Sequence, residues 1–218
     1  MAEAIEMFRD LNLRGPVARR PALREALIGA AVDPWRFDQQ RSDEVARNAV
    51  TSEDVLLFRR APGDDYPGAG LTLWGREDGY YVPNIVPLES GNLTYAQYNA
   101  ILSDFIARIV EPIAPALGFA IDASASHQTL DDWVSADTAI RLRRFSGAAN
   151  KSTGASHPMD QQRWFDFIIA VHRNKDQLGT DQLARWLNEA EHWHEDTAHD
   201  LAGNFETALA LLARYDET

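Results

Sequence analysis

Residues 55–87 read VLLFRRAPGDDYPGAGLTLWGREDGYYVPNIVP, and this stretch decides the fold class. Three runs rich in Val, Leu, Phe, Trp and Tyr alternate with segments rich in Gly, Pro and Asp. Because aromatic and β-branched residues favour strands while Gly, Pro and Asp favour turns, the stretch predicts an antiparallel β-meander. Asp78-Gly79 predicts a hairpin with a type I′ turn between the second and third runs. Pro83 and Pro87 predict that the third strand is short or lies at an edge, since proline cannot donate a ladder hydrogen bond.

Helical patterns flank this meander on both sides. The segment Thr94-x-x-Gln97 predicts a capping box at the start of a helix that ends at Pro112. Apolar residues three and four positions apart predict further helices over about 2–13, 21–31, 42–50, 158–173 and 181–215, the last with a bend at Gly203. Residues 133–145 fit either a helix or a strand, because Ile140-Arg-Leu-Arg also alternates.

Together these patterns predict an α+β protein that is predominantly helical and contains a small antiparallel β-meander. We expect short N-terminal helices over 1–50, the meander and its helix over 51–123, and a helical C-terminal part over 124–218. Isolated helices shorter than about 12 to 15 residues are marginal in water, so the N-terminal helices are expected to pack on the body. A run of small residues over 123–129 favours the second boundary, although the three parts also fit one continuous domain.

The composition argues against several classes of protein. The chain of 218 residues contains no cysteine, which excludes disulfides, thiolate nucleophiles and cysteine-based metal sites. Its formal net charge of −12 argues against a broad nucleic-acid-binding surface, since such surfaces rely on clustered Lys and Arg. No apolar run approaches the roughly 20 residues that span a bilayer, and the acidic start does not resemble a secretory signal. We therefore expect a cytoplasmic protein without a membrane partner, and no motif predicts a cofactor.

A polar loop between two apolar-rich runs is the best candidate site. Its candidate ligand-binding or partner-binding residues are Arg144, Asn150, Lys151, Ser152, Thr153, His157, Asp160, Arg163 and Trp164. Lys151-Ser152-Thr153 superficially matches a nucleotide-binding P-loop, but the glycines of that motif do not precede the lysine, so we reject a Walker-type ATP site. Three interpretations stay open: an anion site at the start of the next helix, a protein interface, or residues that only cap helices and form turns.

Histidines are the candidates for proton transfer and metal binding. His157 and His194 are the candidate catalytic residues, because imidazole titrates near neutrality, and His194 is expected to be partly buried. His192, Glu195 and His199 would share one face of a continuous helix, where they could bind a divalent cation. That face lies opposite the apolar stripe and is typical of solvated surface, and His194 and His199 are too far apart for an HExxH zinc motif. We therefore predict no metal site.

Three functions are consistent with these patterns. The first is a cytoplasmic protein-binding or regulatory subunit of a larger bacterial or phage-type assembly, with another protein or a second copy of the chain as its partner. It is favoured because no catalytic motif is complete and because the short N-terminal helices need a surface to pack on. The second is an enzyme that binds a phosphate-bearing substrate at the 144–163 polar loop. The third is an acidic inhibitor or immunity-type protein whose carboxylates form the binding face.

Overall fold

The computed structural model describes residues 4–48, 54–63 and 66–217 and has the α+β fold that the sequence predicts. The chain forms two compact units. The sheet unit comprises Met7–Ser126, and the helical unit comprises Met1–Glu6 together with His127–Thr218. The chain therefore passes from one unit to the other twice.

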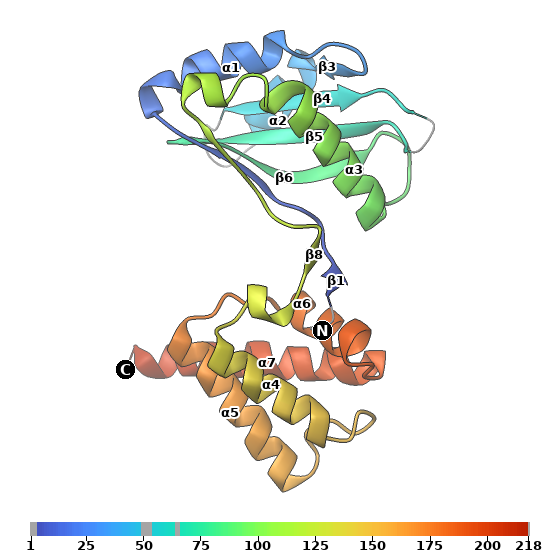
Figure 1. Ribbon diagram of the computed structural model, residues 1–218, viewed down its shortest axis with the longest axis vertical. Coiled ribbons are helices and arrows are strands. Elements are labelled where there is room, and N and C mark those ends of the chain that lie inside the picture. The colour runs from blue at the N-terminus through green and yellow to red at the C-terminus, as the bar shows by residue number, and fades with distance from the viewer. Residues whose placement is uncertain (1–3, 49–53, 64–65, 218) are drawn as a thin grey trace. The chain divides into compact units, whose positions relative to one another are not determined.

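The sheet unit is built on a six-stranded antiparallel sheet with the strand order β3-β4-β5-β6-β2-β7. Figure 1 labels β3 to β6 of this sheet. Its strands are β2 (Leu11–Arg14), β3 (Trp35–Phe37), β4 (Val55–Arg60), β5 (Ala69–Arg76), β6 (Gly79–Pro87) and β7 (Ala120–Ala123). Adjacent pairing of β4 with β5 and of β5 with β6 confirms the predicted meander. The other three strands come from segments on either side of it in the sequence.

The helices of this unit are α1 (Arg20–Gly29), α2 (Gln39–Asn48) and α3 (Tyr95–Phe105), and α3 continues as a π-helical turn over Ile106–Val110. The capping box at Thr94 and Gln97 is formed as predicted. Short 3-10 turns cover Val17–Arg19 and Pro115–Leu117.

The prediction of a helix over residues 2–13 is wrong for the described residues, which form β1 (Ile5–Glu6) and β2. In β2 the buried residues Leu11 and Leu13 alternate with Asn12 and Arg14, and the strand pairs with β6 on one side and β7 on the other. Pairing with residues far away in the sequence therefore outweighs the local helical pattern.

The helical unit contains a two-stranded sheet of β1 and β8 (His127–Gln128), followed by a 3-10 turn over Leu130–Asp132 and then helices. The helices are α4 (Ala136–Ala148), α5 (Pro158–Asn174), α6 (Thr180–Arg185) with a π-helical turn over Trp186–Ala190, and α7 (Glu195–Asp216). Residues 136–148 are thus helical, which settles the ambiguity over 133–145. The long C-terminal helix is interrupted at 191–194 and not at Gly203, and His192 there has a φ of 58°. Among the described residues, no helix is long and apolar enough to cross a membrane.

The hairpin between β5 and β6 is present, but its turn differs from the prediction. Arg76 pairs with Gly79, so Glu77 and Asp78 form the turn, and neither has a positive φ. Gly79 instead has a φ of 156°, and a Cβ there would lie 1.8 Å from the carbonyl oxygen of Leu13. Glycine is thus required because β2 passes so close to β6.

Strand β6 is an edge strand only over residues 82–87, so the edge position predicted from its two prolines applies to that part of the strand. It pairs with β2 from Gly79 to Tyr81. Pro83 and Pro87 lie beyond that contact, where β6 has only β5 beside it, and Pro83 falls at a register shift opposite β5. Each proline therefore occupies a position where a missing N–H breaks no bond to β2.

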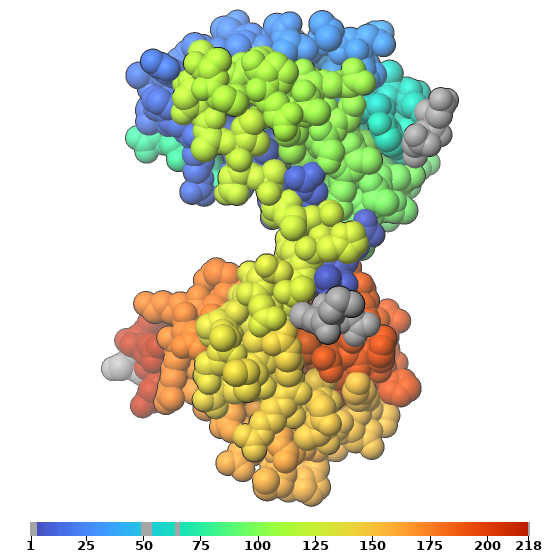
Figure 2. Space-filling view, viewed as in Figure 1, coloured from blue at the N-terminus to red at the C-terminus, as the bar shows by residue number. Residues whose placement is uncertain are grey.

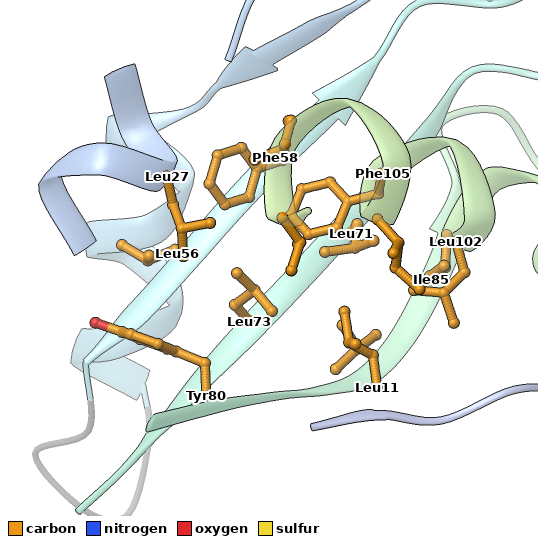
Figure 3. Close-up of a cluster of buried hydrophobic side chains, with 14 of the residues drawn as sticks. Leu11, Leu27, Leu56, Phe58, Leu71, Leu73, Tyr80, Ile85, Leu102 and Phe105 are labelled. Atoms are coloured by element: carbon orange, nitrogen blue, oxygen red, sulfur yellow. The ribbon is translucent and has the colours of Figure 1, made fainter. Parts of the chain in front are cut away.

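One face of the sheet is buried beneath α1 and α3. Leu27 of α1 and Phe105 of α3 belong to the same buried cluster as Phe58, Leu71 and Leu73 of the sheet (Figure 3). Because side chains alternate across a strand, the residues between these positions project from the opposite face.

Asp104 of α3 fixes this helix to two strands. Its Oδ2 accepts hydrogen bonds from Trp35 Nε1 at 2.8 Å and from Arg60 Nε at 3.1 Å, and its Oδ1 accepts one from Arg108 Nε at 2.7 Å. Burial raises the pKa of Asp104, but the hydrogen bonds from Arg108, Trp35 and Arg60 outweigh burial and hold that pKa below its ordinary value of 3.8. The side chain of Arg60 is only 7% exposed, so this carboxylate is its counterion in a nearly dry environment.

Substitution Asp104→Asn should lower the free energy of unfolding by about 3 kcal/mol at pH 7, because Arg60 would keep a buried charge without its counterion. The stabilisation by Asp104 is present above pH 3.8 and is lost as pH falls below it, because the folded-state pKa is the lower one. The difference between wild type and variant should therefore shrink in acid, as measured by urea denaturation at several pH values. Arg108→Ala is the control, and it should cost less than about 1 kcal/mol because Arg108 is exposed. Equal effects of the two substitutions would contradict this role of Asp104.

Substitution Gly79→Ala should destabilise the protein by about 3 kcal/mol, since the added methyl group would overlap the Leu13 carbonyl. Gly29→Ala in α1 is the matched control, because a Cβ there meets nothing within 4 Å. It should be neutral or stabilise by up to about 1 kcal/mol. Thermal unfolding followed by circular dichroism measures both, and an unchanged midpoint for Gly79→Ala would show that β2 does not approach β6 this closely.

Candidate functional site

The polar loop between α4 and α5 is held mainly by bonds within itself. Asn150 Oδ1 accepts from the Ser152 amide at 2.9 Å and from Ser152 Oγ at 2.7 Å, and Asn150 also forms a backbone bridge with Gly154. His157 is the N-cap of α5, where its Nδ1 accepts from the Met159 amide at 3.3 Å. The polar groups thus shape a turn and a helix cap, as the third interpretation of this loop proposed.

Lys151 connects the loop to the break between α6 and α7. Its Nζ donates to the carbonyl oxygen of Glu191. The Glu191 side chain accepts from Ser146 Oγ at 2.7 Å, and Ser146 Oγ in turn accepts from Nε1 of the buried Trp193 at 2.7 Å. Lys151 therefore satisfies a carbonyl at the end of a helix, which leaves the anion interpretation without its central cation.

The other cations near the loop are largely balanced by carboxylates. Arg141, Arg144 and Arg163 line a shallow depression of about 190 Å³ between α4 and α5, together with Asp166. Arg163 pairs with the buried Asp160 at 2.6 Å, and Arg141 pairs with Asp137 at 2.8 Å. Three carboxylates thus accompany three guanidinium groups, so the depression has no excess positive charge for an anion.

The structure leaves both predicted catalytic residues at the surface and interrupts the helix on which the metal candidates were predicted. His157 and His194 are both exposed, so the expectation that His194 is partly buried is wrong. His192 lies in the helix break, which removes the continuous face that it was expected to share with Glu195 and His199. Within the described ranges, no group of three or more His, Cys, Asp or Glu side chains could hold a metal ion.

Trp164 and Thr153 contribute to a groove between α5 and α7. The groove has a volume of about 350 Å³ and is lined by Ser152, Thr153, Gly154, Ala155, Ser156, Gln161, Trp164, Phe165, Thr197, Asp200, Leu201 and Asn204. Trp164 is only 3% exposed and packs against Phe145 with 4.9 Å between ring centroids, so it belongs to the core. Phe165 is the accessible aromatic residue here, at 49% exposed, and the sequence analysis did not single it out.

A second surface lies on the sheet unit, on the face away from α1 and α3. We call it the open face, and it comprises Asn12, Arg14, Arg36, Leu57, Arg59, Thr72, Trp74, Arg76, Tyr81, Asn84 and Val86. Cross-strand pairing places Arg36 opposite Arg59, Thr72 opposite Asn84, and Trp74 opposite Tyr81. All eleven side chains are exposed or half-buried.

The centre of the open face is aromatic and its flanks are cationic. The Arg76 guanidinium lies over the Tyr81 ring, 4.0 Å from its centroid, and donates to Asn12 Oδ1 at 3.0 Å. Arg59 pairs with Asp38 at 2.7 Å. Four arginines thus share one face of a chain whose net charge is −12, which makes the charge of this face opposite to that of the chain as a whole.

Sequence reasoning missed the open face because its residues come from five strands. The signal that could have found part of it is the alternation in β4, where the buried Phe58 is flanked by the half-buried Leu57 and the exposed Arg59. Comparison of the chain with protein-family profiles, with curated proteins and with solved structures finds no match.

Substitution Ser146→Ala should destabilise the protein by about 2 kcal/mol, because the buried Trp193 Nε1 would lose its acceptor. Ser152→Ala is the control, and it should cost less than about 1 kcal/mol because Ser152 is exposed. Chemical denaturation followed by tryptophan fluorescence measures both changes. A Ser146→Ala variant as stable as Ser152→Ala would mean that the Ser146–Trp193 bond does not hold the helix break.

Proposed function

We propose that this protein is a cytoplasmic protein-binding or regulatory subunit of a larger bacterial or phage-type assembly. In this proposal the open face binds an acidic surface of another protein. The observation that carries it is the accessible Trp74–Tyr81 pair at the centre of the face, with arginines on both sides. The proposed cytoplasmic location rests on the absence of cysteine from the sequence.

The composition of the open face supports a protein partner. Trp, Tyr and Arg are the residues most enriched at interface positions that dominate binding energy. Arg76 is already held on Tyr81, so less side-chain entropy is lost when a partner binds. Asn12, Thr72 and Asn84 add both donors and acceptors, which suits the mixed hydrogen bonding of a protein surface.

The charges of the open face favour an acidic protein over a nucleic acid. Two carboxylates, Asp38 and Asp122, lie beside the arginines, with Asp38 bonded to Arg59 and Asp122 paired in register with Asn12. A continuous phosphate backbone would be repelled by them and by the net charge of −12. A protein partner can place its carboxylates beside the arginines and away from Asp38 and Asp122. Because salt screens such charge pairs, association should be fastest at low ionic strength.

The residue positions give less support to the two alternatives. An enzyme acting on a phosphate-bearing substrate at the polar loop would need Lys151 as a cation for the phosphate, but Lys151 already donates to the Glu191 carbonyl. An acidic inhibitor would bind through clustered carboxylates, whereas the aromatic face here is cationic.

The proposal can be tested with a photo-reactive amino acid at Thr72, in the centre of the open face, in cells of the source organism. We expect a cross-link to a discrete protein whose surface is acidic. The link should be lost when Arg36 and Arg59 are both replaced by Glu. The same photo-reactive residue at Glu25, an exposed position on α1, is the control and should give no such cross-link.

The purified partner then gives the quantitative test. Trp74→Ala should weaken its binding by about 30-fold or more, because truncation of a central interface anchor costs about 2 kcal/mol or more. Phe165→Ala in the α5–α7 groove should leave the affinity unchanged. Equal cross-linking from Thr72 and Glu25, or adducts that a nuclease removes, would contradict the proposal.

A further inference from the structure

Over residues 83–87, beyond its pairing with β2, strand β6 has an edge without free N–H groups. The Leu88 amide donates to the Gly68 carbonyl at 2.9 Å, so the backbone polar groups of Leu88 face β5. These groups alternate along an antiparallel strand, so those of Pro83, Ile85 and Pro87 point away from β5. The two prolines have no N–H. The one outward N–H over residues 83–87, that of Ile85, donates to Asn84 Oδ1 at 2.8 Å.

This edge cannot accept another β-strand, since strand pairing needs donors and acceptors in alternation. The outward carbonyl groups of Ile85 and Pro87 still accept hydrogen bonds, because a strand residue presents its N–H and its C=O on the same side. What fits such an edge is a group that only donates.

A groove of about 540 Å³ runs beside this edge. Its lining consists of Phe8, Asn84, Ile85, Val86, Pro87, Glu89, Ser90, Gly91, Asn92, Leu93 and Tyr98. Phe8 is 44% exposed and is held by contacts to Tyr95 and Tyr98, with 4.1 and 4.7 Å between ring centroids. Glu89 is the one carboxylate among these lining residues, and none of them is Lys, Arg or His.

We propose that this groove, the edge groove, binds the guanidinium group of an arginine presented by a peptide or protein. A guanidinium has five N–H donors and no acceptor, which complements an edge of carbonyl oxygens without free N–H groups. Its planar cation can stack on the exposed Phe8 ring and lie near the Glu89 carboxylate. The edge groove shares Asn84 and Val86 with the rim of the open face, but it has the opposite charge, so its ligand does not depend on the proposed function.

The test is a titration of the ¹⁵N-labelled full-length protein with N-acetyl-arginine amide, followed by NMR. N-acetyl-citrulline amide is the matched ligand control, because it has a similar shape but no charge. We expect saturable shifts of the amides over residues 84–93 with the arginine compound, and shifts at least threefold smaller with the citrulline compound. No saturable shift up to 50 mM arginine compound, or equal shifts with both, would overturn the proposal.

Two variants locate the ligand within the groove. Glu89→Gln removes the carboxylate at an exposed position and should weaken binding of N-acetyl-arginine amide by about two- to fivefold. Phe8→Leu keeps an apolar side chain without an aromatic face, and it should also weaken binding by about two- to fivefold. Glu25→Gln on α1 is the control and should change nothing. Binding that is unaffected by both groove variants would show that the arginine compound binds elsewhere.

Discussion

The two-residue alternation of side chains along a strand is the constraint on which the sheet unit depends. Once Phe58, Leu71 and their neighbours are buried beneath α1 and α3, the residues between them must project from the other face. A shift of one residue in register would bury Arg59 and expose Phe58. Packing of the apolar core therefore also places Arg59, Trp74 and Tyr81 on a common surface. The stability of the sheet unit and the proposed interface thus depend on the same alternation of side chains.

Part of this fold could be predicted from sequence because its signals are local. Strands β4 to β6 are separated by turn residues, and α3 begins with a capping box. Strand β2 lacks such a signal. It is four residues long and depends on pairing with 79–81 and 120–123, which lie far away in the sequence. The sequence alone assigned Gly79 to a type I′ turn, whereas a glycine is required there because β2 approaches so closely.

The polar loop likewise combines bonds between residues close in the sequence, which could be predicted, with a bond between distant residues, which could not. Asn150, Ser152 and His157 make bonds to residues at most four positions away, so a structural role could be foreseen for them. Lys151 bonds to Glu191, 40 positions further along the chain, which no spacing rule indicates. This bond lies at the helix break over 191–194, where the apolar pattern of the sequence predicted a continuous helix. Likewise the open face and the edge groove emerge only when the strands are paired.

The proposed interface requires that the open face is accessible to solvent and to a partner. Hydroxyl-radical footprinting of the native protein, read by mass spectrometry, measures this directly at single residues. Trp74 and Tyr81 should be oxidised readily, while Trp35 and Tyr80, both at most 1% exposed in the core, should be protected. Protection of Trp74 and Tyr81 to the same degree as Trp35 and Tyr80 would mean that this face is covered, and it would contradict the proposed interface.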